Sequence, residues 1–313
     1  MEANSEIKTK KRLGVIRGGE GEHYISSLKK GGEIILHIND NLSDTWKVSD
    51  ILIDHNGVWH FSGVPIVPAE LASKVDLVWD TTFPGMSNTL KSLSIPSIGN
   101  DPFFSALEKN NDFLKNNVRE LGISMPRSIV LPLYQEDFDG PRERYSIKKA
   151  KEVHEKFGAP WLVKSFTPDS NMGIHLAKTF GELAGAIEDG VKHDKSILVQ
   201  EFIAGKVASV HSIPNFRSEK VYTFPLGNSF GNFSSEEKEK LINTVKGMYS
   251  HLGAKHYLKS DFVLNTRGKI YLFGIGSHPD LNVDSHFSQV CELIGIKASH
   301  VVDHILEKAT YNL

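Results

Sequence analysis

Two lysines and one aspartate, far apart along the 313-residue chain, have the chemistry to bind a nucleotide. Lys109 lies in a helical pattern, Lys164 ends a strand-like run, and Asp261 lies within a late strand-like run. Ammonium groups neutralise phosphates, and a carboxylate is a preferred ligand of Mg²⁺. Each residue alone has an ordinary explanation, as a surface lysine or a structural acid. Together and in this order, the three residues point to nucleotide chemistry.

Two segments between these residues fit the same chemistry. Residues 165–173 are rich in small and polar side chains, so their backbone N–H groups can come close to phosphates; the segment includes Ser170 and Gly173. Residues 196–203 form a continuous apolar run, which predicts a buried strand. The last residues of this run include Gln200, Glu201 and Ile203.

The elements that must position these residues follow from the hydrophobic pattern. The first hundred residues predict a small α/β unit, with strands at 13–16, 33–38, 51–53 and 75–79. From residue 101 a helical pattern of about four turns runs to Gly122. A capping box at Ser234 and Glu237 begins a later helix. An antiparallel hairpin is expected from strands 257–264 and 269–275.

A glycine-rich segment follows the first expected strand. Gly18, Gly19 and Gly21 precede Glu22, and such glycines let the backbone approach a ligand. The segment lacks the full dinucleotide-binding fingerprint, so a plain strand-to-helix turn is the alternative.

Five motifs, in order along nearly the whole chain, carry a resemblance to a known family. They are the glycine segment 18–22, the lysine motif 106–109, the lysine and its small-residue loop at 161–173, the strand 198–205, and the hairpin 259–262 with 271–285. Their order and spacing resemble the D-alanine–D-alanine ligase branch of the ATP-grasp superfamily.

This resemblance implies an ATP-grasp fold, of mixed α/β and α+β class. Its parts would be an N-terminal pre-ATP-grasp α/β domain (1–100), a central lid-like α+β subdomain (101–203) and a C-terminal α+β subdomain (204–313). The implied cofactors are ATP and Mg²⁺, and the implied reaction joins an amino acid or similar carboxylate to an amine through an acyl phosphate. The implied roles are phosphate binding for Lys109 and Lys164, closure over the phosphates for Ser170 and Gly173, adenine contacts for Gln200, Glu201 and Ile203, Mg²⁺ binding for Asp261, and substrate or oxyanion contacts for Glu22, Ser285 and Lys259.

Several positions depart from the pattern of that family: Pro279-Asp280 replaces a Pro-Gly, residues 79–85 lack a loop that the family has, and four further positions bear on the nucleotide and the metals. Val207 stands where a glutamate binds the ribose hydroxyls, and its side chain accepts no hydrogen bond. Gly274 and Gly276 stand where a glutamate and an asparagine hold the metals, and glycine offers no side-chain oxygen to a hard cation. Lys259 replaces an arginine, giving a point charge instead of a planar fork. These losses predict weakened nucleotide binding and slow turnover.

Two functions of different classes therefore remain open. The first is an ATP-dependent ligase like the D-alanine–D-alanine ligases. The second is a catalytically impaired relative that binds a nucleotide or another small ligand. The residues Val207, Gly274 and Gly276 favour the second.

Composition limits the partners and the compartment. Lys and Arg number 36 against 38 for Asp and Glu, so no global positive charge indicates nucleic acid or an anionic membrane. No run approaches the roughly 18 apolar residues of a membrane span, so a cytoplasmic protein with a small-molecule substrate is expected. The resemblance adds a possible homodimer. The single cysteine, Cys291, lies in an apolar helical pattern that favours a buried thiol over a reactive one.

Two histidine clusters have ordinary alternatives. His300 and His304 have the spacing of a metal-binding helix face, but no third ligand is identified and surface histidines are common. His278 and Asp280 flank a proline, which favours a turn over acid–base chemistry.

Overall fold

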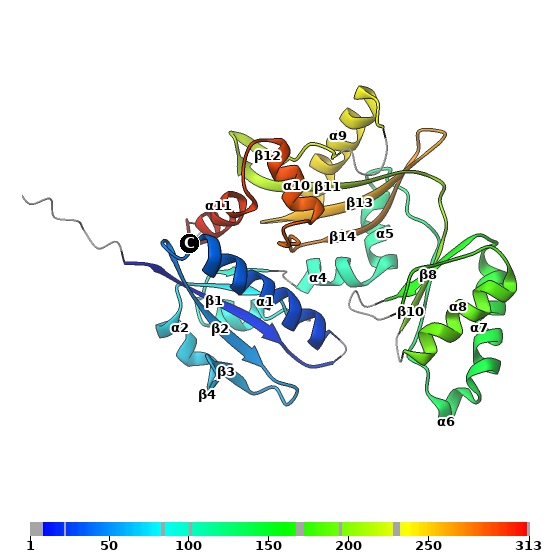
Figure 1. Ribbon diagram of the computed structural model, residues 1–313, viewed down its shortest axis with the longest axis horizontal. Helices are drawn as coiled ribbons and strands as arrows, with labels where there is room; N and C mark the ends of the chain where they lie inside the picture. The colour runs from blue at the N-terminus through cyan, green and yellow to red at the C-terminus, as the bar shows by residue number, and fades with distance from the viewer. Residues whose placement is uncertain are drawn as a thin grey trace, which may run out of the picture.

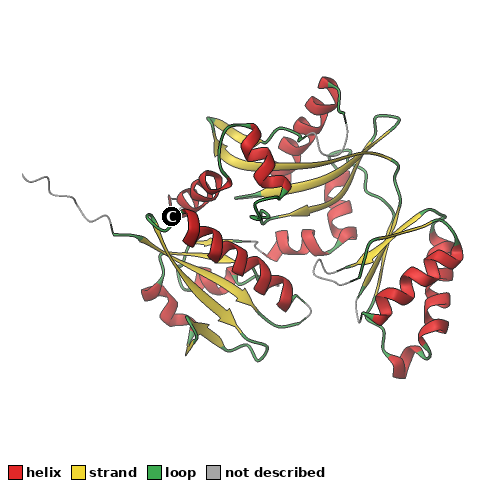
Figure 2. Ribbon diagram, in the orientation of Figure 1, coloured by secondary structure: helices red, strands yellow, loops and turns green. Residues whose placement is uncertain are grey.

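The computed structural model describes residues 9–21, 23–82, 85–99, 102–166, 172–193, 196–227 and 232–311. These residues form three β-sheets with helices packed on them, which is the mixed α/β and α+β architecture expected from the sequence. In Figures 1 and 2 the C-terminal sheet lies between the N-terminal and the central sheet.

The N-terminal sheet has six strands in the order β4-β3-β2-β1-β5-β6. β1 pairs in parallel with β2 and β5, while β3 and β4 form an antiparallel edge. The strands are β1 (Lys11–Gly18), β2 (Trp46–Ile53), β3 (Trp59–Phe61), β4 (Val64–Ile66), β5 (Leu77–Asp80) and β6 (Ser97–Ile98). The helices are α1 (Tyr24–Asn41), the 3₁₀ turn η1 (Pro68–Glu70), α2 (Leu71–Lys74) and α3 (Ser87–Ser92).

The strand expected at residues 33–38 is wrong, because this stretch is the second half of α1. Ile34 and Ile38 are four residues apart and buried, whereas Leu36 between them is 62% exposed. The apolar residues therefore follow the helical period, and the run of isoleucine and leucine resembled a strand only because the exposed Leu36 is also apolar.

The central sheet is antiparallel throughout, in the order β7-β10-β8-β9. Its strands are β7 (Ser128–Leu131), β8 (Trp161–Ser165), β9 (His175–Ala177) and β10 (Ile197–Glu201), and the helices are α6 (Glu136–Asp139), α7 (Arg142–Lys156) and α8 (Phe180–Lys192). Trp161, Val163 and Val199 pack with α7 and α8 in one hydrophobic core. Because successive strand residues point to opposite faces, Lys164 and Leu198 lie on the other face.

The C-terminal sheet is antiparallel, in the order β12-β11-β13-β14. Its strands are β11 (Gly205–Phe216), β12 (Glu219–Thr223), β13 (Leu258–Asn265) and β14 (Ile270–Gly276), and the helix beside it is α9 (Ser235–His251). β13 and β14 form the expected hairpin, and the capping box of Ser234 and Glu237 begins α9 as expected.

The helix expected after residue 101 is two helices, α4 (Pro102–Lys109) and α5 (Asn111–Arg119). The break falls at Asn110, whose side-chain oxygen accepts a hydrogen bond from the backbone N–H of Phe113 at 2.9 Å and caps α5. Leu107 of α4 and Leu114 of α5 pack into the hydrophobic core of the C-terminal sheet. α4 thereby carries Lys109 to the edge of β14.

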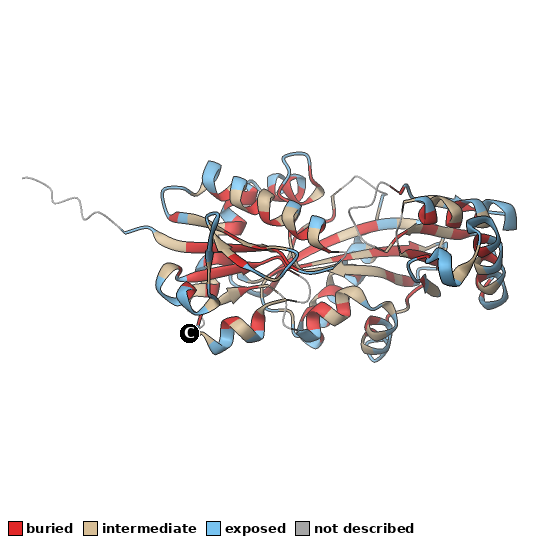
Figure 3. Ribbon diagram, turned by 90° about the horizontal axis from the view of Figure 1, so that it is seen from below, coloured by how far each residue is buried: buried red, intermediate tan, exposed pale blue. Residues whose placement is uncertain are grey.

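The last two helices, α10 (His286–Leu293) and α11 (Ala298–Tyr311), pack back onto the N-terminal sheet. Phe287 and Val301 share a hydrophobic core with Leu13 of β1. Figure 3 shows buried residues along the strands and exposed residues on the outer helix faces. The division of the chain at residues 100 and 203 stays a prediction, since the cores draw residues from both sides of residue 100. Among the residues described, no helix combines the length and apolar character that a membrane crossing requires.

Candidate functional site

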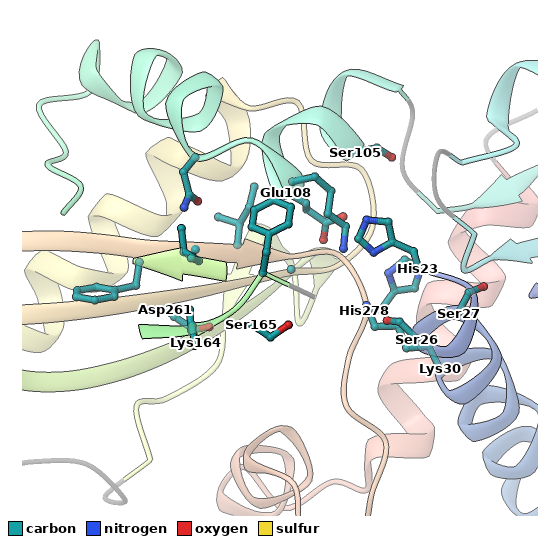
Figure 4. A pocket seen from close by; sticks show the side chains of 18 of the residues that line it. His23, Ser26, Ser27, Lys30, Ser105, Glu108, Lys164, Ser165, Asp261 and His278 are labelled. Atoms are coloured by element: carbon teal, nitrogen blue, oxygen red, sulfur yellow. The ribbon is translucent and has the colours of Figure 1, made fainter. Parts of the chain in front are cut away.

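A cavity of about 490 Å³, here called the central cavity, is lined by residues from all three sheets or their helices. Lys109, Lys164 and Asp261 all line it, although up to 152 positions separate them in the sequence (261 − 109 = 152). Figure 4 shows Lys164 and Asp261 on one side, Lys30 of α1 on the other, and Glu108 of α4 between them. The side chains that the sequence predicted to meet therefore share one cavity.

Lys164 is a partly buried lysine of this cavity. Burial lowers the pKa of its ammonium group, Asp261 opposes this shift, and Lys259 adds to it. The three charges therefore lie within electrostatic reach of one another. The site holds a partly desolvated ammonium group beside a carboxylate, an arrangement in which added negative charge is favourable.

Both carboxylate oxygens of Asp261 are engaged. Nζ of Lys259 lies 3.1 Å from Oδ2, and the hydroxyl of Ser209 donates a hydrogen bond to Oδ1 at 2.5 Å. Ser209 lies directly opposite Asp261 in the pairing of β11 with β13, and Gly274 lies opposite it in the pairing of β13 with β14. The sheet register therefore sets the surroundings of this acid.

The residues at this position do not fit a bound divalent cation. Gly274 and Gly276 line the central cavity beside Asp261 and supply no side-chain oxygen. A Cβ atom on Gly274 would meet nothing within 4 Å, so space for a ligand side chain exists but no side chain fills it. In the described part of the chain, no group of three or more His, Cys, Asp and Glu residues could hold a metal ion.

A second polar group lies where α4 meets the loop after β14. The backbone N–H of Ser277 donates to Oε1 of Glu108 at 2.6 Å. Burial raises the pKa of Glu108, although Lys30 and Lys109 pull it down. This acid is therefore held closer to its neutral form than an exposed glutamate.

His278 joins this group and links it to the N-terminal sheet. Its Nε2–H donates to the backbone carbonyl of Asp80 at 3.0 Å, so its Nδ1 accepts from the hydroxyl of Ser277 at 2.8 Å. Burial lowers the pKa of His278 to about 3, which keeps the ring neutral. The ring ties the C-terminal hairpin to the end of β5, and both of its nitrogens are used.

Several residues predicted for the site lie outside the lining of the central cavity. Ser285 is the N-cap of α10, accepting from the backbone N–H of Ser288 at 3.1 Å and donating to the carbonyl of Asp280 at 2.8 Å. Glu201 pairs with Arg127 at 2.9 Å, and this partner lowers its pKa. Lys259 does not line the cavity itself, but it forms an ion pair with Asp261, which does. The other residues in this class are Gly173, Gln200 and Ile203. Glu22 and Ser170 fall outside the described residues.

Gln200 nevertheless has an unusual environment. It is 1% exposed, and its Oε1 accepts no hydrogen bond from any described residue. It lies two residues after Leu198 on β10, and Leu198 lines the central cavity. Alternate residues of a strand share a face, so Gln200 lies on the cavity face of the sheet. A buried acceptor without a donor is costly unless a ligand supplies one.

Sequence reasoning did not single out three residues of this site: Lys30, Glu108 and Ser209. Lys30 lies on α1, where part of the helix was expected as a strand. Glu108 directly precedes Lys109 in the lysine motif, so its place next to a predicted site residue was the available signal. Ser209 meets Asp261 only through sheet pairing, for which the sequence holds no local signal.

Comparisons with known proteins agree with this architecture. The family model for the D-ala D-ala ligase C-terminus matches residues 119–224. The D-alanine–D-alanine ligase of Desulforamulus reducens is 23% identical over 318 aligned residues, covering 95% of this chain and 98% of the relative. That of Borrelia garinii subsp. bavariensis is also 23% identical and covers 96% of both chains.

Solved structures show the same fold. D-alanyl-alanine synthetase A of Vibrio cholerae superposes with a TM-score of 0.69 at 19% identity, covering 97% of this chain and all of the other. The D-alanine–D-alanine ligase of Bacillus anthracis complexed with ATP has a TM-score of 0.64 at 19% identity and covers 96% of this chain and 97% of the other. This chain is therefore a distant relative of the D-alanine–D-alanine ligase family and has its ATP-grasp fold.

Proposed function

We propose that the protein binds a nucleoside triphosphate, ATP first of all, in the central cavity and carries out ligation slowly or not at all. The observation that carries this proposal is the convergence of Lys109 and Lys164 on a cavity that also holds Asp261. Two ammonium groups that line one cavity can neutralise the phosphates of one ligand.

The charges of the cavity support an anionic ligand. Three lysines line it, namely Lys30, Lys109 and Lys164, and a fourth, Lys259, pairs with Asp261. Among the described residues that line it there are two acids, and both are compensated: Asp261 is ion-paired, and burial raises the pKa of Glu108. The excess of positive charge faces a partly desolvated space, where its attraction for phosphate is stronger than in water.

Gln200 supports a nucleobase next to those phosphates. Its buried Oε1 accepts no hydrogen bond from any described residue, and an adenine amino group is a donor of the type it needs. Its position on the cavity face of β10 puts this acceptor on the same sheet as Lys164. A single ligand that spans both residues would carry a base at one end and phosphates at the other.

The weak part of the site is its chemistry. Phosphoryl transfer relies on metal ions that neutralise charge between the phosphates, and the residues around Asp261 do not form a metal site. Val207, where the family pattern has a ribose-binding glutamate, is 43% exposed and apolar. Without these contacts the transition state loses several kcal/mol of stabilisation. Because each 1.36 kcal/mol is a factor of ten in rate, we expect the transfer to be slower by about 10³-fold or more.

Calorimetric titration of the full chain with ATP tests the proposal. We expect measurable binding that Lys164→Met weakens by at least about tenfold, since one charge-assisted contact is lost. Lys148→Met is the matched control, because Lys148 is exposed on α7 and lies outside the cavity. Absence of ATP binding by the folded wild type, or equal loss in both variants, would rule the proposal out.

A second candidate function is ATP-dependent ligation of an amino acid or a similar carboxylate. It is favoured by one observation: the central cavity extends beyond Glu108 to Lys30, Ser26 and Thr82, which leaves room for a second ligand next to the phosphates. Phosphate release that depends on both ATP and D-alanine would establish this function. ATP binding without such release would leave the binding function alone.

A further inference from the structure

The carboxylate expected to hold a metal holds an ammonium group instead. Lys259 and Asp261 are two residues apart on β13 and share a face of the strand. Nζ of Lys259 lies 3.1 Å from Oδ2 of Asp261, and Oδ1 accepts from the hydroxyl of Ser209. The side chains of Lys259 and Asp261 are 38% and 37% exposed, and Asp261 lines the central cavity, so a ligand in the cavity can meet the acid that Lys259 pairs with.

A divalent cation would find poor ligands here. Mg²⁺ requires near-octahedral oxygen coordination, and β14 offers glycine at both positions beside Asp261. The cation would also have to approach a carboxylate that already has a positive charge 3.1 Å away. Both effects disfavour a metal at this position.

The same arrangement is well suited to phosphate. Burial lowers the pKa of Lys164 and Lys259 adds to this shift, so the charge of Lys259 acts on the site where the phosphates of the proposed nucleotide would lie. Lys109 and Lys30, which also line the central cavity, add positive charge. Side-chain ammonium groups are thus already present where a metal complex would otherwise bring positive charge with it.

We infer that the central cavity binds the phosphates of its nucleotide without a divalent cation, and that Lys259 takes the place of the metal at Asp261. This inference rests on the proposed function, because it specifies the form in which the nucleotide binds. Its ligand is the free polyphosphate anion of the nucleotide, and not its magnesium complex.

The test is calorimetric titration of the full-length protein with ATP, once with excess Mg²⁺ and once with EDTA. The inference expects the Kd in EDTA to be equal to that in Mg²⁺ within about threefold, or lower. A Kd at least about tenfold higher in EDTA would overturn it and leave the proposed nucleotide site intact. Absence of binding in both buffers would remove the proposed function, and the inference with it.

Two variants are expected to change the ATP affinity in opposite directions. A general loss of structure would lower the affinity in both. Asp261→Asn removes a negative charge from the phosphate site and is expected to strengthen ATP binding in EDTA. Lys259→Met leaves Asp261 unpaired and is expected to weaken ATP binding in EDTA by about tenfold, with Mg²⁺ restoring part of the loss. If Asp261→Asn instead weakens binding only when Mg²⁺ is present, Asp261 is a metal ligand and the inference is wrong.

Lys269→Met is the matched control for Lys259→Met. Lys269 is exposed at the turn between β13 and β14, and its Nζ lies 5.0 Å from the centroid of the Tyr271 ring, away from the lining of the central cavity. The Lys269→Met substitution changes the net charge of the same hairpin by the same amount as Lys259→Met. An equal loss of affinity in both variants would show a general charge effect, and would overturn the specific role of Lys259.

Discussion

Nε2 of His211 lies 2.8 Å from Nδ1 of His286, and the two imidazole rings share one hydrogen bond. On its other side, Nδ1 of His211 lies 2.6 Å from the hydroxyl of Tyr257. Burial lowers the pKa of His211 well below its usual value, and His286 adds to the shift. His211 is therefore neutral, with one nitrogen donating and the other accepting. The network joins three elements: His211 lies on β11, Tyr257 directly precedes β13, and His286 begins α10. β13 is the strand that carries Asp261.

Removing the tyrosine hydroxyl should destabilise this network. Tyr257→Phe leaves a buried ring nitrogen of His211 without a partner, so we expect the free energy of unfolding to fall by about 1–3 kcal/mol. Tyr222→Phe is the control, since Tyr222 is also buried but its hydroxyl makes no hydrogen bond within the described part of the chain. Urea denaturation measures both variants, and equal losses would contradict the assigned role of the Tyr257 hydroxyl.

The histidines also predict the direction of the pH dependence of stability. Burial lowers the pKa of His211 and His286, and lowers that of His256 to about 4. The unfolded chain takes up these protons near pH 6.5, whereas the folded chain does not, so stability falls as the pH drops below about 6.5. The raised pKa values of Glu108 and Asp80 act in the opposite direction, because the folded chain takes up these protons at a higher pH than the unfolded chain does.

Comparing variants separates these contributions. His256→Asn should reduce the loss of Tm between pH 7 and pH 5, because one proton no longer binds preferentially to the unfolded chain. His300→Asn, at an exposed position of α11, should leave the slope unchanged. A steeper slope in His256→Asn than in the wild type would show that the assigned sign is wrong.

Two adjacent glycines of α1 predict substitutions of opposite effect. A Cβ atom on Gly31 would lie 2.6 Å from Cβ of Arg17, which cannot move away because it is attached to the backbone of β1. Gly31→Ala should therefore destabilise the protein by about 1–3 kcal/mol through overpacking. On Gly32 the nearest atom would be 3.8 Å away, so Gly32→Ala should stabilise the helix by about 0.5–1 kcal/mol. Thermal denaturation of both variants checks the signs, and destabilisation by both would contradict this packing.

The sequence predicted the parts of the site that have local signals. Lys164 follows a strand pattern and precedes small residues, and Asp261 lies in the hairpin that the pattern predicted, so both could be placed on their elements. Lys109 was placed on a helix, but that helix was expected to run on to Gly122, and the break at Asn110 was missed because the apolar pattern continues across it. Here a capping side chain determined the boundary, while periodicity did not.

The parts that were not predicted depend on tertiary pairing. Ser209 reaches Asp261 through a strand pairing across 52 positions, and His211 reaches His286 across 75. No local pattern encodes these contacts. The ion pair of Lys259 with Asp261 could have been predicted, because the two side chains are two residues apart on an expected strand and so share a face of it. The family resemblance assigned them separate roles, and that separation hid the pairing.

The two glycines of β14 offer the last prediction. Neither position has a positive φ, and a Cβ would meet nothing within 4 Å on Gly274 and only Cβ of Lys259 at 3.8 Å on Gly276. Side chains can therefore be added without strain. Gly274→Glu with Gly276→Asn would place a carboxylate and an amide oxygen beside Asp261, as a hard cation requires.

Together with Lys259→Met, these two substitutions should make ATP binding dependent on magnesium. Adding Lys259→Met frees Asp261, and in this triple variant we expect Mg²⁺ to increase the ATP affinity by at least about tenfold in calorimetric titration. The matched control carries Gly274→Gln in place of Gly274→Glu, which keeps the size of the side chain and removes its charge, so its response to Mg²⁺ should be smaller. If the triple variant stays folded and its ATP affinity is the same with Mg²⁺ as with EDTA, the phosphates do not lie at Asp261, and the orientation proposed for the nucleotide is wrong.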